Sequence, residues 1–209
     1  MKMKLSPLFA LAGLALATTQ IQAESLVDGS AEAGKARALT CTACHGAEGN
    51  SVSPLWPNIA GQNAPYILAQ LQAFKDGSRQ DPLMSSQAMM LSEDDMANLA
   101  VYFESLPAAA QSVADQSLLD RGEALYRGGS KAEEASACLA CHGPSGRGNP
   151  AAKYPALNGQ HAAYIAKQLN AYADATRTTD GKTRVMRDIV ANLDKEDIAA
   201  LSSYVQGLK

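Results

Sequence analysis

The sequence predicts an all-α protein built from two similar domains in tandem. Apolar residues recur at helix spacing, and no segment shows sustained alternation of apolar and polar residues with β-branched enrichment. The chain also contains an internal repeat, in which the pentapeptide CTACH (41–45) matches CLACH (138–142) at an offset of 97 residues. The match extends to LSEDDMANLAVYFESL (91–106) and LDKEDIAALSSYVQGL (193–208), at an offset of 102. Because the period is so long, the repeat indicates a duplicated domain and not a solenoid.

The first residues have the pattern of a secretory signal peptide. Two lysines precede the apolar run Leu8–Ala17, which ends in small or polar residues near Ala23. The run is too short to span a bilayer. We therefore expect residues 1–23 to be a signal peptide cleaved near Ala23, and the mature protein to be exported. An uncleaved N-terminal anchor is the alternative.

The repeat divides the mature chain into an N-terminal domain at 24–106 and a C-terminal domain at 118–209. Between them, residues 107–117 (PAAAQSVADQS) are small and polar and begin with proline, which is typical of a linker. Domains of about 90 residues are small for a self-sufficient apolar core, so a large bound cofactor would help to stabilise each of them.

Each domain is expected to contain an opening helix, a middle helix and a last helix. The opening helices are placed around 31–39 and 118–126, before the cysteines. In the middle helix of the first domain, Asn63 is the expected N-cap and apolar residues recur at helix spacing, a pattern that the second domain repeats. The last helices are expected to follow the N-caps Ser92 and Asp194, each with an aspartate three residues on.

Charge is unevenly distributed along the chain. The whole sequence has 18 basic and 21 acidic residues, but residues 24–111 contain 4 basic and 10 acidic residues, whereas 112–209 contain 12 and 11. An acidic protein of this kind is a poor candidate for nucleic-acid binding. A charged face is usually only a solvated face, yet a dipole of this kind would orient the protein toward a charged partner.

Two Cys-x-x-Cys-His motifs carry the strongest chemical signal, and they contain all four cysteines: Cys41, Cys44, Cys138 and Cys141. A structural zinc site needs four ligands, but the two pairs lie in different domains. A thioredoxin-like pair belongs in a βαβ setting, which the helical prediction excludes. Covalent haem attachment uses every cysteine, requires export and supplies the missing core, so the sequence predicts two haem c groups. Disulfides or zinc are the alternatives.

The histidine of each motif, His45 or His142, is the expected proximal iron ligand. The third histidine, His161, has no counterpart in the first domain, where Asn63 stands at the matching position. A site present in one domain only is not the common distal ligand. We interpret His161 as a helix-start residue or a hydrogen-bonding residue at a haem edge.

Methionine is the expected second axial ligand, because it is the usual one in electron-transfer cytochromes. The second domain has one methionine after its motif, Met186, seven residues before the leucine that precedes the last helix. Met84 stands at the same place in the first domain. Met89 and Met90 are the alternatives, since loop alignments are often off by a few residues. With His and Met bound, the iron would pass electrons but not readily bind peroxide or oxygen.

Two further matched pairs are weaker candidates. Arg79 and Arg177 could pair with haem propionates, because a guanidinium suits a carboxylate, or they could face solvent. Trp56 and Tyr154 could pack on a haem edge and donate a hydrogen bond to a propionate, or belong to the ordinary core.

The chain closely resembles the dihaem cytochrome c4 family, whose domains are class I-like cytochrome c domains. The resemblance is carried by CxACHG followed by IAGQ or LNGQ, a tyrosine-containing helix, and GEALYRGG opening the second half. It implies two cytochrome c folds related by an approximate twofold axis, with the axial pairs His45/Met84 and His142/Met186. It also implies a periplasmic electron carrier, soluble or peripherally associated with the membrane. Such a carrier would connect redox proteins such as a quinol-oxidising complex and a terminal oxidase.

Two other functions are open at this point. The cytochrome subunit of a dehydrogenase complex, such as a flavocytochrome, can have the same dihaem architecture. A dihaem peroxidase needs one iron with an open or displaceable ligand, and the paired methionines argue against it. The sequence therefore predicts an electron-transfer protein and not an enzyme.

Overall fold

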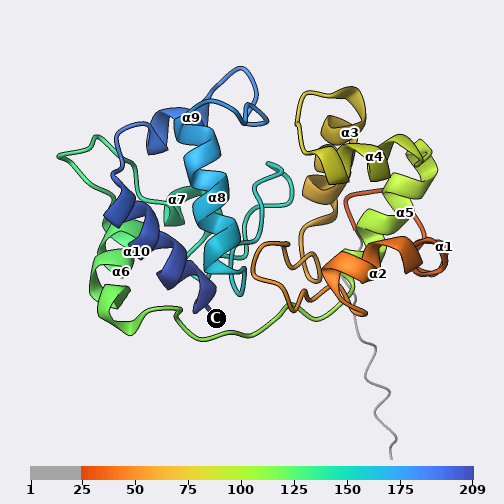
Figure 1. Cartoon of the computed structure of the whole chain (residues 1–209), viewed down its shortest axis with the longest axis horizontal. Coiled ribbons are helices and arrows are strands. Elements are labelled where there is room, and N and C mark those ends of the chain that lie inside the picture. The colour runs from red at the N-terminus through yellow and green to blue at the C-terminus, as the bar shows by residue number, and fades with distance from the viewer. Residues whose placement is uncertain (1–24) are drawn as a thin grey trace, which may run out of the picture.

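The computed structural model describes residues 25–209, which form two helical halves lying side by side (Figure 1). An extended segment after residue 106 runs along one edge of both halves and connects them (Figure 1). Within residues 25–209 there is no β-strand, only the isolated bridges Ser130–Ala135 and Asn149–Tyr154. The all-α prediction is confirmed. The signal-peptide prediction falls on residues 1–23 and lies outside the described residues.

The first half contains α1–α5, and the second contains a short 3₁₀ helix, η1, and α6–α10 (Figure 1). The bounds in the first half are α1 Ala31–Arg37, α2 Leu39–His45, α3 Ala64–Asp76, α4 Pro82–Met89 and α5 Glu93–Glu104. In the second half they are η1 Gln116–Leu118, α6 Leu119–Gly128, α7 Leu139–His142, α8 Ala162–Ala173, α9 Val185–Val190 and α10 Lys195–Gln206. Among the described helices, none has the length and apolar character needed to cross a membrane.

The last helix of each half begins where the sequence predicts. The Ser92 hydroxyl accepts a hydrogen bond from the Asp95 N–H, and the Asp95 carboxylate accepts one from the Ser92 N–H, both at 3.0 Å. This reciprocal capping box satisfies two donors at the start of α5. Asp194 caps α10 by accepting from the Asp197 N–H at 2.8 Å.

Asn63 precedes α3, but the prediction that its side chain caps this helix is wrong. Its Nδ2 instead donates to the carbonyl oxygen of Tyr154 in the other half, at 2.8 Å. The N–H of Ala64 donates to the Glu104 carboxylate at 2.7 Å, which replaces the missing cap. The Asn63 side chain, which the local sequence predicts as a helix cap, therefore forms a contact between the halves instead.

Each half is held together by a close crossing of its first and last α-helices, α1 on α5 and α6 on α10. A glycine stands at each crossing. A Cβ on Gly34 would overlap the backbone carbonyl of Asn98, and a Cβ on Gly122 would overlap that of Ala200. Because a close-packed backbone cannot yield to such an overlap, both crossings require glycine.

We expect Gly122→Ala to lower the free energy of unfolding by about 1–3 kcal/mol, because an overpacked site forces the backbone apart. Gly128→Ala, in the last turn of the same helix, is the matched control, since an added Cβ there meets nothing within 4 Å. Denaturant unfolding of the holoprotein, followed by circular dichroism, measures both. Equal stability of the two variants would contradict the close crossing.

The two halves contact each other through polar groups in the loops that precede α3 and α8. Asn58 Nδ2 donates to the carbonyl oxygen of Gly159 at 2.8 Å, and His161 Nε2 donates to that of Ser51 at 2.9 Å. From the connecting segment, Gln111 Nε2 also donates to the Gly159 oxygen, at 2.7 Å. These bonds fix one half against the other.

Candidate functional site

A cavity of about 1160 Å³ is lined by residues from both halves. Its walls include both Cys-x-x-Cys-His motifs, the first on α2 and the second on α7 and its N-cap Cys138, together with residues of α3, α4, α8 and α9. Matched positions of the internal repeat thus face one mostly apolar space. A cavity of this size and character suits large apolar cofactors with a few polar contacts.

The two motif histidines are each held in one tautomer. His45 Nδ1 lies 2.8 Å from the carbonyl oxygen of Pro57, and His142 Nδ1 lies 3.0 Å from that of Pro155. A carbonyl oxygen only accepts, so each Nδ1 carries the proton and each Nε2 keeps a free lone pair. Burial lowers the pKa of both histidines, which favours the neutral ring. A neutral imidazole with a bonded Nδ1–H is the form that binds a metal ion.

The four cysteines line the same cavity and form no disulfide in the part of the chain that the structure describes. Burial raises the pKa of the Cys41 thiol, and it raises that of Cys138 to about 11. Within residues 25–209, no group of three or more Cys, His, Asp or Glu side chains could hold a metal ion. The zinc alternative therefore lacks its ligand set.

Met84 on α4 and Met186 on α9 both line the cavity. Met90 borders it as well, but this side chain is 62% exposed. Met89 is 63% exposed and is not among the residues that line the cavity. The structure thus brings Met84 and Met186, one from each half, to the wall of the same cavity.

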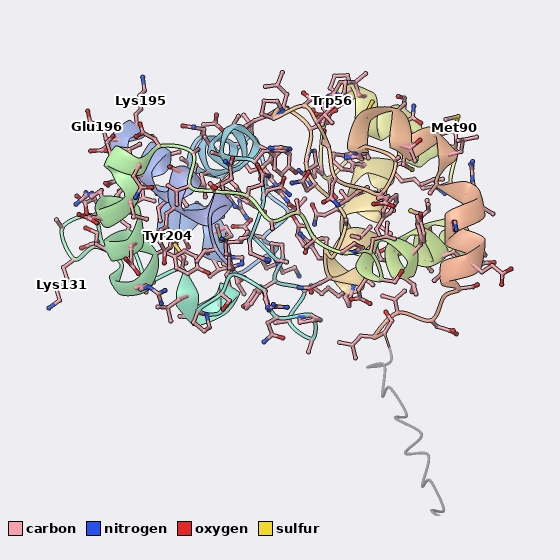
Figure 2. All side chains as sticks on the ribbon, turned by 90° about the horizontal axis from the view of Figure 1, so that it is seen from below. Trp56, Met90, Lys131, Lys195, Glu196 and Tyr204 are labelled. Carbon is pink, nitrogen blue, oxygen red and sulfur yellow. The ribbon has the colours of Figure 1, made fainter. Side chains whose placement is uncertain are left out.

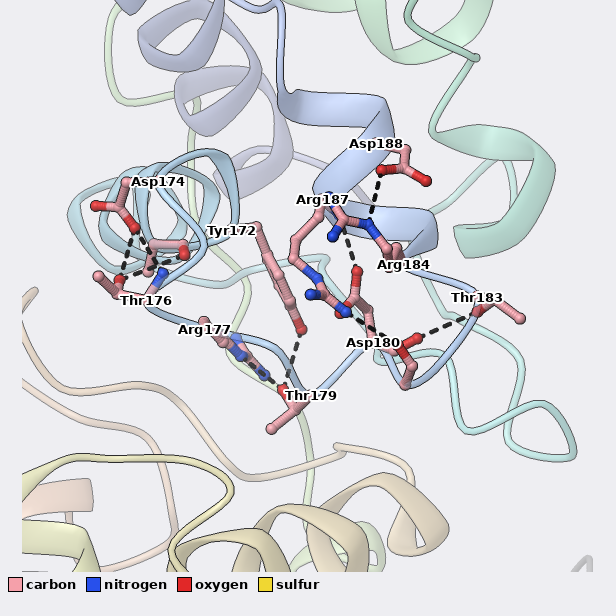
Figure 3. A network of polar contacts seen from close by, with 12 residues as sticks. Tyr172, Asp174, Thr176, Arg177, Thr179, Asp180, Thr183, Arg184, Arg187 and Asp188 are labelled. Carbon is pink, nitrogen blue, oxygen red and sulfur yellow. Dashed lines mark hydrogen bonds and ion pairs between the residues drawn. The ribbon is translucent and has the colours of Figure 1, made fainter.

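An aspartate fixes each methionine helix. In the first half, Asp81 Oδ1 accepts from the N–H groups of Leu83 and Met84, both at 3.1 Å. In the second half, the buried Asp180 accepts from Arg187 N at 2.9 Å and from Arg187 Nε at 2.8 Å (Figure 3). The apolar pattern predicts neither helix, although an aspartate followed by proline is a helix-start signal at α4.

Arg79 and Arg177 reach across the interface between the halves. Arg79 donates to the hydroxyl of Tyr164 at 3.0 Å, and Arg177 donates to that of Tyr66 at 2.8 Å. The two arginines are only 8% and 6% exposed, which removes the solvent-facing alternative. Both guanidinium groups also contact the same two glutamines, Gln70 and Gln168.

Neither arginine has a carboxylate partner among the described residues. Arg79 lies over the ring of Phe74 and Arg177 over that of Tyr172, at 4.5 and 4.6 Å from the ring centroids. Burial raises the pKa of Tyr66, but Arg177 and Arg79 lower it by more, so the net shift is downward. Two buried cations are costly without counter-charge, so this part of the cavity wall favours anionic groups.

Trp56 and Tyr154 both lie on the cavity wall. Trp56 is 38% exposed and projects from the surface of the first half (Figure 2), so it is not an ordinary core residue. The Tyr154 ring centroid lies 6.2 Å from that of His142. His161 is the N-cap residue of α8 and is not among the residues that line the cavity.

Gln62 and Gln160 are candidates that sequence reasoning missed. Each side chain binds the backbone of the other half, next to the proline whose carbonyl accepts from a motif histidine. The signal available in the sequence was their matched position in IAGQ (59–62) and LNGQ (157–160).

The residues present fit two haem c groups. Each half presents two unpaired thiols, a neutral imidazole with a free Nε2, and a thioether to one apolar cavity. This donor set is that of a covalently attached haem with His and Met as axial ligands.

Comparisons with known proteins show which family the chain belongs to. The sequence profile of the Cytochrome c family matches residues 31–107 and 120–209. Cytochrome c4 of Pseudomonas aeruginosa is 49% identical over 180 residues, which cover 86% of this chain and 89% of that protein. The crystal structure of reduced recombinant cytochrome c4 from Pseudomonas stutzeri matches with a TM-score of 0.84 at 44% identity, covering 87% of this chain and 100% of the other.

A more distant relative is the thiosulfate dehydrogenase electron acceptor of Stutzerimonas stutzeri, 33% identical over 175 residues, with 80% of this chain and 78% of that protein covered. The cytochrome c4 relatives are periplasmic c-type cytochromes. The chain is therefore a dihaem c-type cytochrome that transfers electrons and is not an enzyme, and it belongs to the cytochrome c4 family.

Proposed function

We propose that each domain holds one haem through its own motif and that the protein relays single electrons between respiratory partners in the periplasm. In the N-terminal domain (24–106) the iron ligands would be His45 and Met84, and in the C-terminal domain (118–209) they would be His142 and Met186. The observation that carries this proposal is the shared cavity, to which both domains contribute the same donor set.

Haem c, when bound, supplies an iron that alternates between the ferric and ferrous states and so carries one electron. The chain's own residues do the rest. The cysteines anchor the cofactor, and the Pro57 and Pro155 carbonyls orient the histidines by accepting from their Nδ1–H groups. With a histidine and a methionine bound to each iron, neither would keep a vacant position for a substrate. Arg79 and Arg177 would face the propionates, which would supply the counter-charge that these buried cations lack.

The two domains offer different surfaces to partners. The large apolar side chains that the described chain exposes all lie in the N-terminal domain: Leu26, Leu39, Val52, Leu55, Trp56, Leu83, Met89 and Met90. Trp56 and Met90 lie on this domain in Figure 2, whereas Lys131 and Lys195 project from the far end of the other. An apolar surface on an acidic domain suits a redox partner with a basic rim.

The C-terminal domain would bind the second redox partner. Electrons would pass through the protein from a quinol-oxidising complex toward a terminal oxidase. The protein would reach the periplasm through a signal peptide cleaved near Ala23, and it would act in solution or peripherally associated with the membrane.

We expect electron transfer to a partner with a basic docking face to slow as ionic strength rises, because salt screens attraction to the acidic domain. Stopped-flow rates at several salt concentrations measure this. Glu48→Gln, on the exposed surface of the N-terminal domain, should weaken the salt dependence. Glu196→Gln, at the far end of the C-terminal domain (Figure 2), is the matched control. Rates that do not change with salt for either partner would show that electrostatic attraction does not guide docking.

A second candidate is the cytochrome subunit of a dehydrogenase complex. The relative named as a thiosulfate dehydrogenase electron acceptor favours it, because the two proteins match over most of their lengths. Purification of the native protein distinguishes the two functions. A dehydrogenase present in equal amount with the cytochrome would support the second candidate, and a separate cytochrome would support the free carrier.

A further inference from the structure

Gln62 and Gln160 join the two domains through reciprocal contacts, which we call the glutamine clamps. Gln160 Oε1 accepts from the Asn58 N–H at 2.9 Å, and its Nε2 donates to the Asn58 carbonyl at 2.8 Å. In the opposite direction, Gln62 Oε1 accepts from the Ala156 N–H at 2.7 Å, and its Nε2 donates to the Ala156 carbonyl at 2.8 Å. Both glutamines are buried. Asn58 and Ala156 occupy matched positions of the repeat, as do the two glutamines.

In the N-terminal domain, the clamp holds the peptide unit that orients the motif histidine. The Pro57 carbonyl, which accepts from His45 Nδ1, belongs to the same planar peptide bond as the Asn58 N–H. The hydrogen bonds therefore form one chain, from His45 through the Pro57–Asn58 peptide to Gln160 of the other domain.

The C-terminal domain has the same chain in the opposite direction. It runs from His142 through the Pro155–Ala156 peptide to Gln62. The two chains differ at the clamped residue: Asn58 Nδ2 also donates to the Gly159 carbonyl, and Asn58 Oδ1 accepts from the Ser51 N–H, whereas the alanine side chain at 156 has no such groups. The clamped residue of the N-terminal domain is therefore held by two more bonds.

This arrangement acts on the histidine in two ways. The clamp fixes the plane of the peptide, and so fixes the direction in which its carbonyl accepts from Nδ1. An acceptor on the N–H also polarises the amide, which makes the carbonyl a stronger acceptor. A stronger bond to Nδ1–H makes the imidazole a more basic ligand, and outer partners of this kind tune metal sites.

We propose that Gln160 is a positioning residue for His45, and Gln62 for His142, so that each domain tunes the iron ligand of the other. This proposal rests on the assignment of the two histidines as iron ligands under the proposed function. A more basic imidazole stabilises ferric iron, so loss of a clamp should raise the reduction potential of the haem in the opposite domain.

The test uses the holoprotein with Gln160→Leu or Gln62→Leu, which keep bulk but remove both hydrogen-bonding groups. Proton NMR of the ferric protein gives the shifted ring signals of each axial histidine, assigned to a domain through Met84→Ala and Met186→Ala. A redox titration gives the two potentials. Gln160→Leu should move the His45 signals and the potential of the N-terminal haem. Gln62→Leu should move those of the C-terminal haem.

This crossed pattern makes each variant the control for the other. Shifts in the variant's own domain, equal shifts in both domains, or no shift would each overturn the proposal. Should a leucine variant not take up haem, Gln160→Glu keeps an acceptor for the Asn58 N–H and makes it a carboxylate, so the potential of the N-terminal haem should fall or stay unchanged, and a rise would overturn the proposal. The unsubstituted holoprotein tests the ligand assignment separately, since it must show two sets of axial-histidine signals.

Discussion

Ferric Met186→Ala is expected to lose about half of the weak absorption band at the red end of the spectrum, which reports the iron–sulfur bond. Met84→Ala should lose the other half, because Met84 and Met186 are the proposed thioether ligands of the two domains and both line the shared cavity. Absorption spectra at equal haem concentration measure both variants. The double variant should lose the band entirely and gain the capacity to bind external ligands such as carbon monoxide in the reduced state.

Two neighbouring methionines provide the controls. Met89 is 63% exposed and is not among the cavity-lining residues, so Met89→Ala should keep the full band. Met90 borders the cavity and is the real competitor in the first domain. A band that survives in Met84→Ala and is halved in Met90→Ala would contradict the assignment of Met84.

Arg177→Leu is expected to lower the reduction potential of both haems. A buried positive charge stabilises the reduced, more negative state, and a charge in a low-dielectric site acts strongly. Both haems should respond because Arg177 contacts Tyr66 and Gln70 of the other domain as well as Gln168 of its own. Arg79→Leu should have the same effect, since its contacts are the matched set. A redox titration followed by visible absorption measures the two potentials.

Arg147→Leu is the control for charge alone, because Arg147 is exposed and solvent screens its charge. It should leave both potentials nearly unchanged. An equal shift in Arg147→Leu and Arg177→Leu would show that total charge, and not a buried cation beside the cofactor, sets the potential. Unchanged potentials in both arginine variants would remove Arg79 and Arg177 from the haem environment.

Much of the fold could be predicted because its signals are local. A helix capped by Ser92 or Asp194 needs only the capping side chain and apolar residues three or four positions apart. Both signals lie within a short stretch of the sequence. Met84 was selected in the same way, by its distance from the next helix in a repeat whose second copy has one methionine. Met84 and Met90 both line the cavity and Met89 does not, so the choice of Met84 over Met90 stays a prediction.

Short helices were harder to predict. The helices α4 and α9 have only 8 and 6 residues, too few for an apolar period to stand out. Their positions depend instead on Asp81 and Asp180, whose carboxylates bind backbone N–H groups at 2.9–3.1 Å. At Asn63 a clear local signal misleads. Its position predicts a helix cap, but its side chain donates a hydrogen bond to the carbonyl oxygen of Tyr154 in the other domain.

The sequence by itself determined the helical class, the duplication, the haem attachment motifs and the candidate axial ligands, because each depends on residues within a short span or on direct comparison of two copies. Only the tertiary structure showed which residues form the interface between the two domains. Arg79 and Arg177 lie buried at a shared interface, and Gln62 and Gln160 hold the peptides that orient the opposite histidines. These contacts join residues 85–111 positions apart along the chain. No local pattern records such pairs, because their proximity results from the packing of one domain on the other.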